Sequence, residues 1–218
     1  MVRVEKLFPQ VWTWSDEAGW STRPDRTFTR TGYAVELPER DGLLLIDPPG
    51  LADGDLARLE PIGRPRFILL TCNDHLREAA AYRERWGAEL MVNRVGADSL
   101  GVVPDGLLDD GDVLWKTVTA IHLPNVYSPG ETAFLVSRPG CRVLFVGDAL
   151  CGGRDDTGVP DGEIGIFSTA YITDWVAARR SLARLLEFPF DAICFGHGSP
   201  VTEAPDLALR RFLSSLGP

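Results

Sequence analysis

Four side chains that could bind a metal ion follow strand-like runs of the sequence. Asp74 and His75 come after "FILLTCN", Asp148 comes after "VLFVG", and His197 comes after "AICFG". Imidazole nitrogens and carboxylate oxygens are ligands for divalent ions such as Zn²⁺, Mn²⁺ and Fe²⁺, and a catalytic zinc commonly needs only three protein ligands plus water. The chain has 3 histidines, and two of them belong to this set. The pattern therefore predicts one metal site.

Each of these residues also has an ordinary structural interpretation. An aspartate just before a helix is commonly an N-cap, as Asp74 could be, and Asp148 could order a turn. His197 lies between two glycines and could be a loop histidine. The remaining histidine, His122, lies in a strand-like run, and we expect it to be structural. The metal interpretation therefore depends on the fold bringing the candidate residues together.

Apolar runs separated by glycine and proline predict the elements of the first half of the chain. Residues 31–37 and 41–50 are expected to pair as a hairpin around the turn-forming "PERDG". Residues 66–70 predict a strand, and the segment after it predicts a helix that ends at Gly87. One face of this helix is expected to carry Leu76, Ala79, Ala80 and Trp86.

The second half repeats the order of strand, loop and helix. Residues 131–137 and 142–150 predict two strands around "RPGC", and residues 190–196 predict a buried strand. Asp174 is expected to cap a helix, and residues 204–217 predict a closing helix. The buried stripe of the capped helix is expected to be Trp175, Ala178, Leu182, Leu185 and Leu186. Strands between helices indicate a layered α/β architecture.

Composition favours a single domain over residues 1–218. With 44% hydrophobic residues, the chain can bury a large core. The net charge of −9 disfavours nucleic acid as a partner, and no segment reaches the roughly 20 apolar residues that a membrane span needs. We therefore expect a cytoplasmic protein with a small-molecule partner, while its oligomeric state stays open.

Two further features have alternative interpretations. Residues 152–174 are rich in glycine and aspartate, which is typical of a lid, an interface or a plain solvated loop. The 4 cysteines form no C-x-x-C pair. Cys141 and Cys194 are expected to be free structural thiols. Cys72 and Cys151 lie beside candidate ligands, so each is a further candidate for the metal site.

Five segments in this order resemble the metallo-β-lactamase superfamily: "GYAV…LLLIDPPG", "ILLTCNDHLREAAAYRERWGAEL", "IHLPNVYSPGETAFLV", "VLFVGDAL" and "FGHGSPV". The resemblance covers nearly the whole chain and implies a four-layer αββα sandwich. In that family, a T-H-x-H-x-D-H segment and later histidines bind two metal ions. By this resemblance, Asp74 and His75 match the Asp-His pair. Asp148 matches the aspartate that bridges the ions, and His197 matches the final histidine.

The other half of the family's site is missing from this sequence. The segment "LTCNDH" is shorter than the family pattern, with Cys72 and Asn73 where histidines are expected, and Tyr127 stands at the position of a third histidine. Arg77 and Glu78 replace a usual Gly-Gly pair. The resemblance therefore implies at most one divalent ion (Zn, Mn or Fe), and a metal-free site is the alternative.

Two hypotheses of function follow from the resemblance. The first is a hydrolase with a mononuclear site that acts on an ester, thioester, lactone or phosphoester, with Asp74, Arg77 and Tyr127 as candidate catalytic residues. Arg77 is expected to point into the cleft and bind an anionic group of the substrate, rather than pair with Asp74 or Asp148. The second is a non-catalytic member that binds a small molecule or a protein partner.

Overall fold

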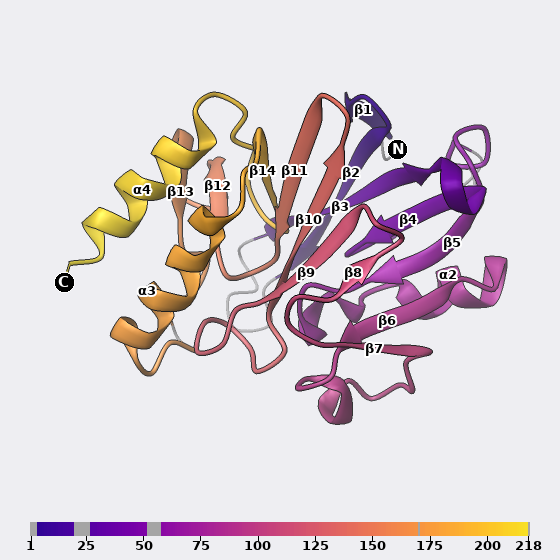
Figure 1. Cartoon of the computed structure of the whole chain (residues 1–218), viewed down its shortest axis with the longest axis horizontal. Coiled ribbons are helices and arrows are strands. Elements are labelled where there is room, and N and C mark those ends of the chain that lie inside the picture. The colour runs from indigo at the N-terminus through magenta and orange to yellow at the C-terminus, as the bar shows by residue number, and fades with distance from the viewer. Residues whose placement is uncertain (1–3, 20–26, 52–57, 170, 218) are drawn as a thin grey trace.

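Two β-sheets lie face to face, and helices cover their outer faces (Figure 1). The computed structural model describes residues 4–19, 27–51, 58–169 and 171–217. Buried side chains fill the space between the sheets, the space between the first sheet and α2 (Ala79–Trp86), and the space between the second sheet and helices α3 (Trp175–Ala183) and α4 (Pro205–Ser215). These layers form the αββα sandwich that the family resemblance implied.

The first sheet has seven strands among the described residues, paired in chain order. They are β1 (Glu5–Phe8), β2 (Val11–Gly19), β3 (Thr27–Leu37), β4 (Gly42–Ile46), β5 (Pro65–Leu69), β6 (Glu89–Asn93) and β7 (Gly106–Leu108). The pairs from β1 to β4 are antiparallel, and those from β4 to β7 are parallel. The predicted hairpin and the predicted strand at residues 66–70 are confirmed. β4 ends before residue 50 because Pro48 and Pro49 have no N–H to donate.

The second sheet has the strand order β14-β11-β10-β9-β8 within the described part of the chain. These strands are β8 (Val113–Leu114), β9 (Val118–His122), β10 (Thr132–Arg138), β11 (Cys141–Val146) and β14 (Ala192–Phe195). β11 and β14 are parallel, whereas the other pairs are antiparallel. The strands predicted at residues 131–137, 142–150 and 190–196 are confirmed, although β11 ends at Val146 and leaves Asp148 in the loop that follows.

The helices differ in detail from the sequence prediction. A 3₁₀ turn, η2 (Asn73–Leu76), precedes α2, so the helix begins later than predicted. Its buried face therefore carries Tyr82 beside Ala79 and Trp86, while Ala80 is exposed. Gly87 ends the helix at a φ of 67°, as predicted.

The helix at α3 begins as the sequence predicted. The Asp174 side chain accepts a hydrogen bond from the Ala177 N–H at 2.9 Å, which confirms the N-cap. The predicted burial of Trp175 is wrong, since this side chain is 41% exposed and the inward stripe begins one turn later at Ala178. The short 3₁₀ helix η4 (Arg184–Glu187) follows α3. Shorter 3₁₀ turns, η1 (Pro38–Arg40) and η3 (Ala97–Ser99), lie in other connections.

Part of the segment at residues 152–174 forms a hairpin rather than a loop without regular structure. Its strands are β12 (Cys151–Arg154) and β13 (Val159–Gly165), which pair antiparallel. The hairpin contacts both α4 and β14. Of the three alternatives, the plain solvated loop is wrong for this part of the segment, which packs beside the strand leading to His197.

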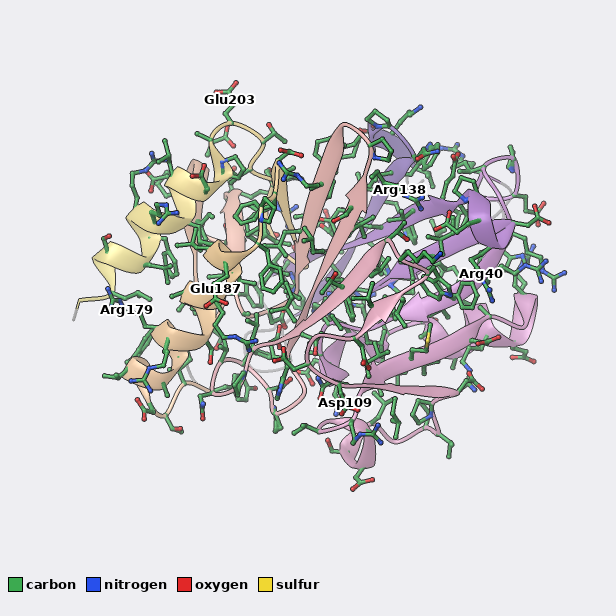
Figure 2. The ribbon with its side chains drawn as sticks, viewed as in Figure 1. Arg40, Asp109, Arg138, Arg179, Glu187 and Glu203 are labelled. Atoms are coloured by element: carbon green, nitrogen blue, oxygen red, sulfur yellow. The ribbon has the colours of Figure 1, made fainter. Side chains whose placement is uncertain are left out.

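Figure 2 shows side chains filling the spaces between these layers, with Glu203 pointing outward. The largest fully buried side chains include Trp14, Tyr33 and Phe134. Among the described residues, none of the helices has the length and apolar character to cross a membrane.

Candidate functional site

His75, Asp148 and His197 come together at the ends of three strands. His75 lies in η2, just after β5 of the first sheet, whereas Asp148 follows β11 and His197 follows β14 of the second sheet. The Nε2 atoms of His75 and His197 lie 3.0 Å and 3.1 Å from Asp148 Oδ1. All three side chains are buried. The junction between the two sheets thus gathers two imidazoles around one carboxylate.

The other ring nitrogen of each histidine fixes the direction of the imidazole. His75 Nδ1 lies 2.9 Å from Asp47 Oδ2, and His197 Nδ1 lies 2.8 Å from the Thr29 carbonyl oxygen. Because a carbonyl or a carboxylate oxygen accepts, this arrangement places a hydrogen on each Nδ1. In a neutral ring the lone pair is then on Nε2, directed at Asp148, as in the carboxylate–histidine pairs that orient metal ligands.

Three buried acceptor atoms therefore converge when both imidazoles are neutral. Within the described residues, His75 Nε2 and Asp148 Oδ1 have no hydrogen-bond partner despite their short separation. Ligand atoms around a tetrahedral zinc ion lie about 3.3 Å apart, which is close to each of the two distances from Asp148 Oδ1 to an Nε2 atom. Converging acceptors in a buried site need a cation between them. That cation is either a metal ion or a proton.

The charges at the site oppose one another. Burial raises the pKa of Asp148, but the two neighbouring imidazoles outweigh it and bring the net pKa well below the usual value. Burial and the Arg77 charge lower the pKa of His75, yet Asp148, Cys72 and Asp47 outweigh them and bring it well above its usual value. The site therefore attracts positive charge, whether this is a proton on His75 or a bound ion.

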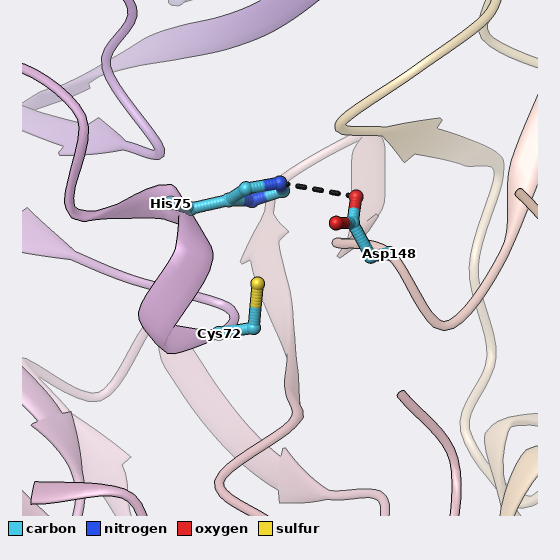
Figure 3. A group of neighbouring side chains, drawn as sticks. All are labelled: Cys72, His75 and Asp148. Atoms are coloured by element: carbon cyan, nitrogen blue, oxygen red, sulfur yellow. Dashed lines mark ion pairs between the residues drawn. The ribbon is translucent and has the colours of Figure 1, made fainter. Parts of the chain in front are cut away.

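Cys72 lies beside this cluster. Figure 3 shows its thiol pointing toward His75 and Asp148. The ligand atoms of these three residues all lie within 4.8 Å of one another, and they form the one such group found in the described part of the chain. His197 contacts Asp148 but does not belong to this group. Burial raises the pKa of the Cys72 thiol to about 12, so the free thiol is neutral at physiological pH. Cys151 is buried on β12 and does not belong to this group.

Asp74 and Tyr127 occupy a more open position. The Tyr127 hydroxyl donates a hydrogen bond to Asp74 Oδ2 at 2.9 Å, and Asp74 is exposed. Burial, together with the Asp148 and Asp74 carboxylates, raises the pKa of Tyr127, so the phenol keeps its proton. Asp74 does not belong to the group of converging ligand atoms in the described residues. The catalytic and metal-binding roles predicted for these two residues stay predictions.

Arg77 binds backbone rather than a carboxylate side chain. Its Nη1 donates to the carbonyl oxygens of Thr31 and Asp47, each at 3.1 Å. The backbone of Arg77 has a φ of 37° and a ψ of −116°, a conformation more typical of the glycine that the family has here. Burial lowers the pKa of this guanidinium. These bonds connect β3 to Asp47, and the expected role in binding an anionic substrate stays a prediction.

Several supporting residues of the site were not identified from the sequence. The Asp47 carboxylate accepts hydrogen bonds from the Thr71 N–H at 2.8 Å and the Thr71 hydroxyl at 2.6 Å, in addition to its contact with His75. Asp47 follows the apolar run "LLLI", the same signal that identified Asp148. Glu131 is also buried, and burial and Asp148 raise its pKa well above the usual value, so it is a neutral acid.

Aromatic rings lie on the outer side of His197. The Phe167 ring stacks on the His197 imidazole, with centroids 3.9 Å apart and an interplanar angle of 7°. Phe28 contacts the same imidazole edge-on, with centroids 5.2 Å apart. His122, in contrast, lies away from the cluster and its Nε2 contacts the Pro129 carbonyl oxygen at 2.8 Å, as expected for a structural histidine.

Comparisons with known proteins agree with this architecture. A family model described as the metallo-beta-lactamase superfamily matches residues 8–204. A metallo-beta-lactamase from Pontibacter korlensis has 15% identity and a TM-score of 0.74, with 99% of each chain covered. A protein titled as a metallo beta lactamase from Hirschia baltica has 16% identity and a TM-score of 0.70, with 100% of this chain and 98% of that chain covered.

A third similar structure is a metallo-beta-lactamase from Pseudomonas aeruginosa in a mono-zinc form. It has 12% identity and a TM-score of 0.71, with 100% of this chain and 97% of that chain covered. At these identities the likeness concerns the fold alone. The comparison with curated proteins gives no match.

Proposed function

Since the chain belongs to the metallo-β-lactamase superfamily, we propose that it is a metal-dependent hydrolase that binds one divalent ion. The observation that carries the proposal is the convergence of two Nε2 atoms on the buried Asp148 Oδ1. We propose His75, Asp148 and His197 as its three protein ligands, of which the first two belong with Cys72 to the group of mutually close ligand atoms and the third contacts Asp148 from outside that group. The mono-zinc structure from Pseudomonas aeruginosa indicates that this fold accommodates a single ion.

The residues around the ligands hold them in the form that binds a metal. Asp47 keeps the hydrogen of His75 on Nδ1, and the Thr29 carbonyl does the same for His197. The Thr71 hydroxyl and N–H hold Asp47 in turn. Each ligand therefore has a fixed direction before an ion binds, which lowers the cost of ordering the site.

The ligand types favour zinc over the alternatives of manganese and iron. Imidazole suits zinc well, and a thiolate is a soft ligand that zinc accepts. When bound, such an ion polarises a carbonyl or phosphoryl group and makes water acidic enough to attack near neutral pH. Cys72 is close enough to be a fourth ligand, but it would first have to lose a proton whose pKa is raised to about 12.

The neutral phenol of Tyr127 is a hydrogen-bond donor near this site. Its proton is directed at Asp74 in the present arrangement. A substrate oxygen that displaced the Asp74 carboxylate would receive this hydrogen bond instead. An ester, thioester, lactone or phosphoester presents such an oxygen, and we propose this group of substrates. The partly buried rings of Phe28 and Phe167 favour an apolar group beside His197.

Elemental analysis and a hydrolysis assay together test the proposal. We expect one equivalent of zinc per chain after dialysis, and hydrolysis of at least one p-nitrophenyl ester or phosphoester that ceases when a chelator removes the metal. Asp148→Asn keeps the side-chain shape and removes the negative charge, so it should lose both metal and activity. A chain that binds no zinc at pH 8 and remains inactive would exclude the metal-dependent hydrolase.

A non-catalytic member is the second candidate function, and one observation favours it. The net pKa of His75 lies well above its usual value because Asp148, Cys72 and Asp47 outweigh the effects of burial and Arg77. A proton on His75 would therefore satisfy Asp47 and Asp148 without any metal. In that case the cleft binds a small molecule or a partner, and neither zinc nor a chelator changes the free energy of unfolding.

A further inference from the structure

The β12–β13 hairpin lies directly against the segment that carries His197. The Gly152 N–H donates to the His197 carbonyl oxygen at 3.1 Å, and the Ser199 N–H donates to the Gly153 carbonyl oxygen at 3.2 Å. The backbone of the hairpin therefore pairs with the backbone on both sides of Gly198. These bonds fix the path of the chain at His197.

This contact depends on residues without a side chain. A Cβ placed on Gly152 would lie 1.9 Å from the Ser199 carbonyl oxygen, and one on Gly198 would lie 2.1 Å from the Gly152 carbonyl oxygen. Gly198 also has a φ of 87°, which favours glycine. The two segments approach so closely that a side chain at either glycine would force the backbones of the hairpin and the His197 segment apart.

The same hairpin reaches the other side of His197 through Thr29. Asp156 Oδ2 accepts a hydrogen bond from the Thr29 N–H at 2.7 Å. Arg154 Nη2 donates to the Thr29 carbonyl oxygen at 3.2 Å, and Arg154 Nε donates to Asp156 Oδ1 at 2.6 Å. The Arg154–Asp156 pair thus holds both polar backbone groups of Thr29. The Thr29 carbonyl oxygen is also the acceptor for His197 Nδ1.

We propose that Arg154 and Asp156 are positioning residues that set the tautomer and direction of the His197 imidazole through the Thr29 carbonyl. They act from a hairpin that contributes no ligand of its own to the His75–Asp148–His197 cluster. The tautomer part of the proposal concerns the metal-free protein. Only its effect on affinity rests on the proposed function, in which His197 binds the ion.

The alternative is that the Arg154–Asp156 pair only stabilises the fold. A partly exposed ion pair contributes little to the free energy of unfolding. A residue that orients a metal ligand has a larger effect on the site, commonly a 10–100-fold change in metal affinity. The two roles therefore predict different results on mutation. Loss of a positioning pair lowers metal affinity far more than it lowers the free energy of unfolding.

The experiment uses the full chain with Asp156→Ala, Asp156→Asn and the control Asp155→Ala. Asp155 lies on the same hairpin and is exposed, so its removal matches the change of charge. Nitrogen-15 NMR of the metal-free protein reports which ring nitrogen of His197 carries the hydrogen. Zinc affinity is measured by competition with a chromophoric chelator, and urea unfolding reports stability.

We expect Asp156→Ala to reduce the population of the Nδ1–H tautomer of His197 and to weaken zinc binding about tenfold. Asp156→Asn keeps an acceptor for the Thr29 N–H, so it should restore most of both signals. Asp155→Ala should leave both unchanged. The proposal would be overturned if Asp156→Ala left the population of the Nδ1–H tautomer of His197 at its wild-type value. It would also be overturned if Asp155→Ala reduced that population as much as Asp156→Ala does. If the wild-type chain binds no zinc, the proposed function fails while the tautomer measurement still decides the positioning role.

Discussion

The candidate site has a buried half, made of His75, Asp148 and His197, and a more exposed half, made of the exposed Asp74 and the half-buried Tyr127. In the buried half, acceptor atoms face one another at 3.0 Å and 3.1 Å. In the exposed half, a phenol hydroxyl donates to a carboxylate at 2.9 Å. The exposed pair is satisfied by its own hydrogen bond and by water, whereas the buried set needs an added cation.

This difference indicates which side chains of the candidate site need a cation to compensate their buried acceptor atoms. Buried acceptors without a donor cost free energy, so their convergence needs a compensating ion or proton. Solvent reaches an exposed carboxylate, so Asp74 has no comparable requirement. The types of residue that resemble the family motif are found in both halves. Only the geometry separates them.

The largest expected effect is the loss of the ion from the buried half. His197→Ala should lower zinc affinity by more than about 100-fold, because two protein ligands remain beside a Cys72 thiol whose raised pKa keeps it protonated. Competition with a chelator and elemental analysis after dialysis measure this loss. His122→Ala is the matched control, since His122 contacts the Pro129 carbonyl oxygen outside the cluster. Metal content equal to wild type in His197→Ala would contradict the proposed ligand set.

A smaller effect is expected at the residue that orients His75. Asp47→Asn places an amide where the carboxylate accepts hydrogen bonds from Thr71 and faces His75 Nδ1. We expect zinc affinity to fall about 10–100-fold while the protein stays folded. The same zinc competition, with urea unfolding alongside, checks this. A change below about threefold would contradict the role of Asp47 in orienting His75 for metal binding.

Substitutions at Arg77 test whether the unusual backbone conformation of this residue costs free energy of folding. Arg77→Gly and Arg77→Ala both lose the bonds to the Thr31 and Asp47 carbonyl oxygens. The φ of 37° favours glycine, so the glycine variant should be more stable than the alanine variant by about 1 kcal/mol. Urea unfolding measures the difference. Equal stability would mean that this loop relaxes when the guanidinium is removed.

The smallest effect is expected in the exposed half. Tyr127→Phe removes the hydrogen bond to Asp74, yet zinc affinity should stay within about twofold of wild type because neither residue belongs to the group of mutually close ligand atoms and the removed phenol is neutral. The chelator competition of the previous variants applies here as well. A tenfold loss would bring Tyr127 and Asp74 into the metal site and remove the distinction between the two halves.

Sequence patterns predicted the strands, the layers and the residue types of the buried half. The apolar runs before Asp148 and His197 can be recognised from the sequence alone. Because the fold brings such strand ends to one edge, these residues were expected to lie together. The β12–β13 hairpin was missed because its strands are rich in glycine and charged residues, so no alternating apolar pattern identifies them. On α2, the predicted burial of Ala79 and Trp86 is confirmed, whereas Ala80 is exposed and the buried Tyr82 was missed.

The supporting contacts of the site could not be predicted for a different reason. Thr29 and Asp47 act through bonds that join positions far apart in the chain. Thr29 supplies only a backbone carbonyl, which every residue has, so its side chain carries no signal. Asp47 carried the same signal as Asp148, but it lies in "LLLIDPPG", a segment in which the resemblance assigned no ligand.

The bond between His197 and the Thr29 carbonyl spans 168 positions, which has a consequence for the order of folding. Contacts of such high sequence separation form only after a large loop has closed, so they are expected after the transition state for folding. The ligand cluster would then be assembled only once both sheets have docked. A bound ion would consequently slow unfolding and leave the rate of folding nearly unchanged.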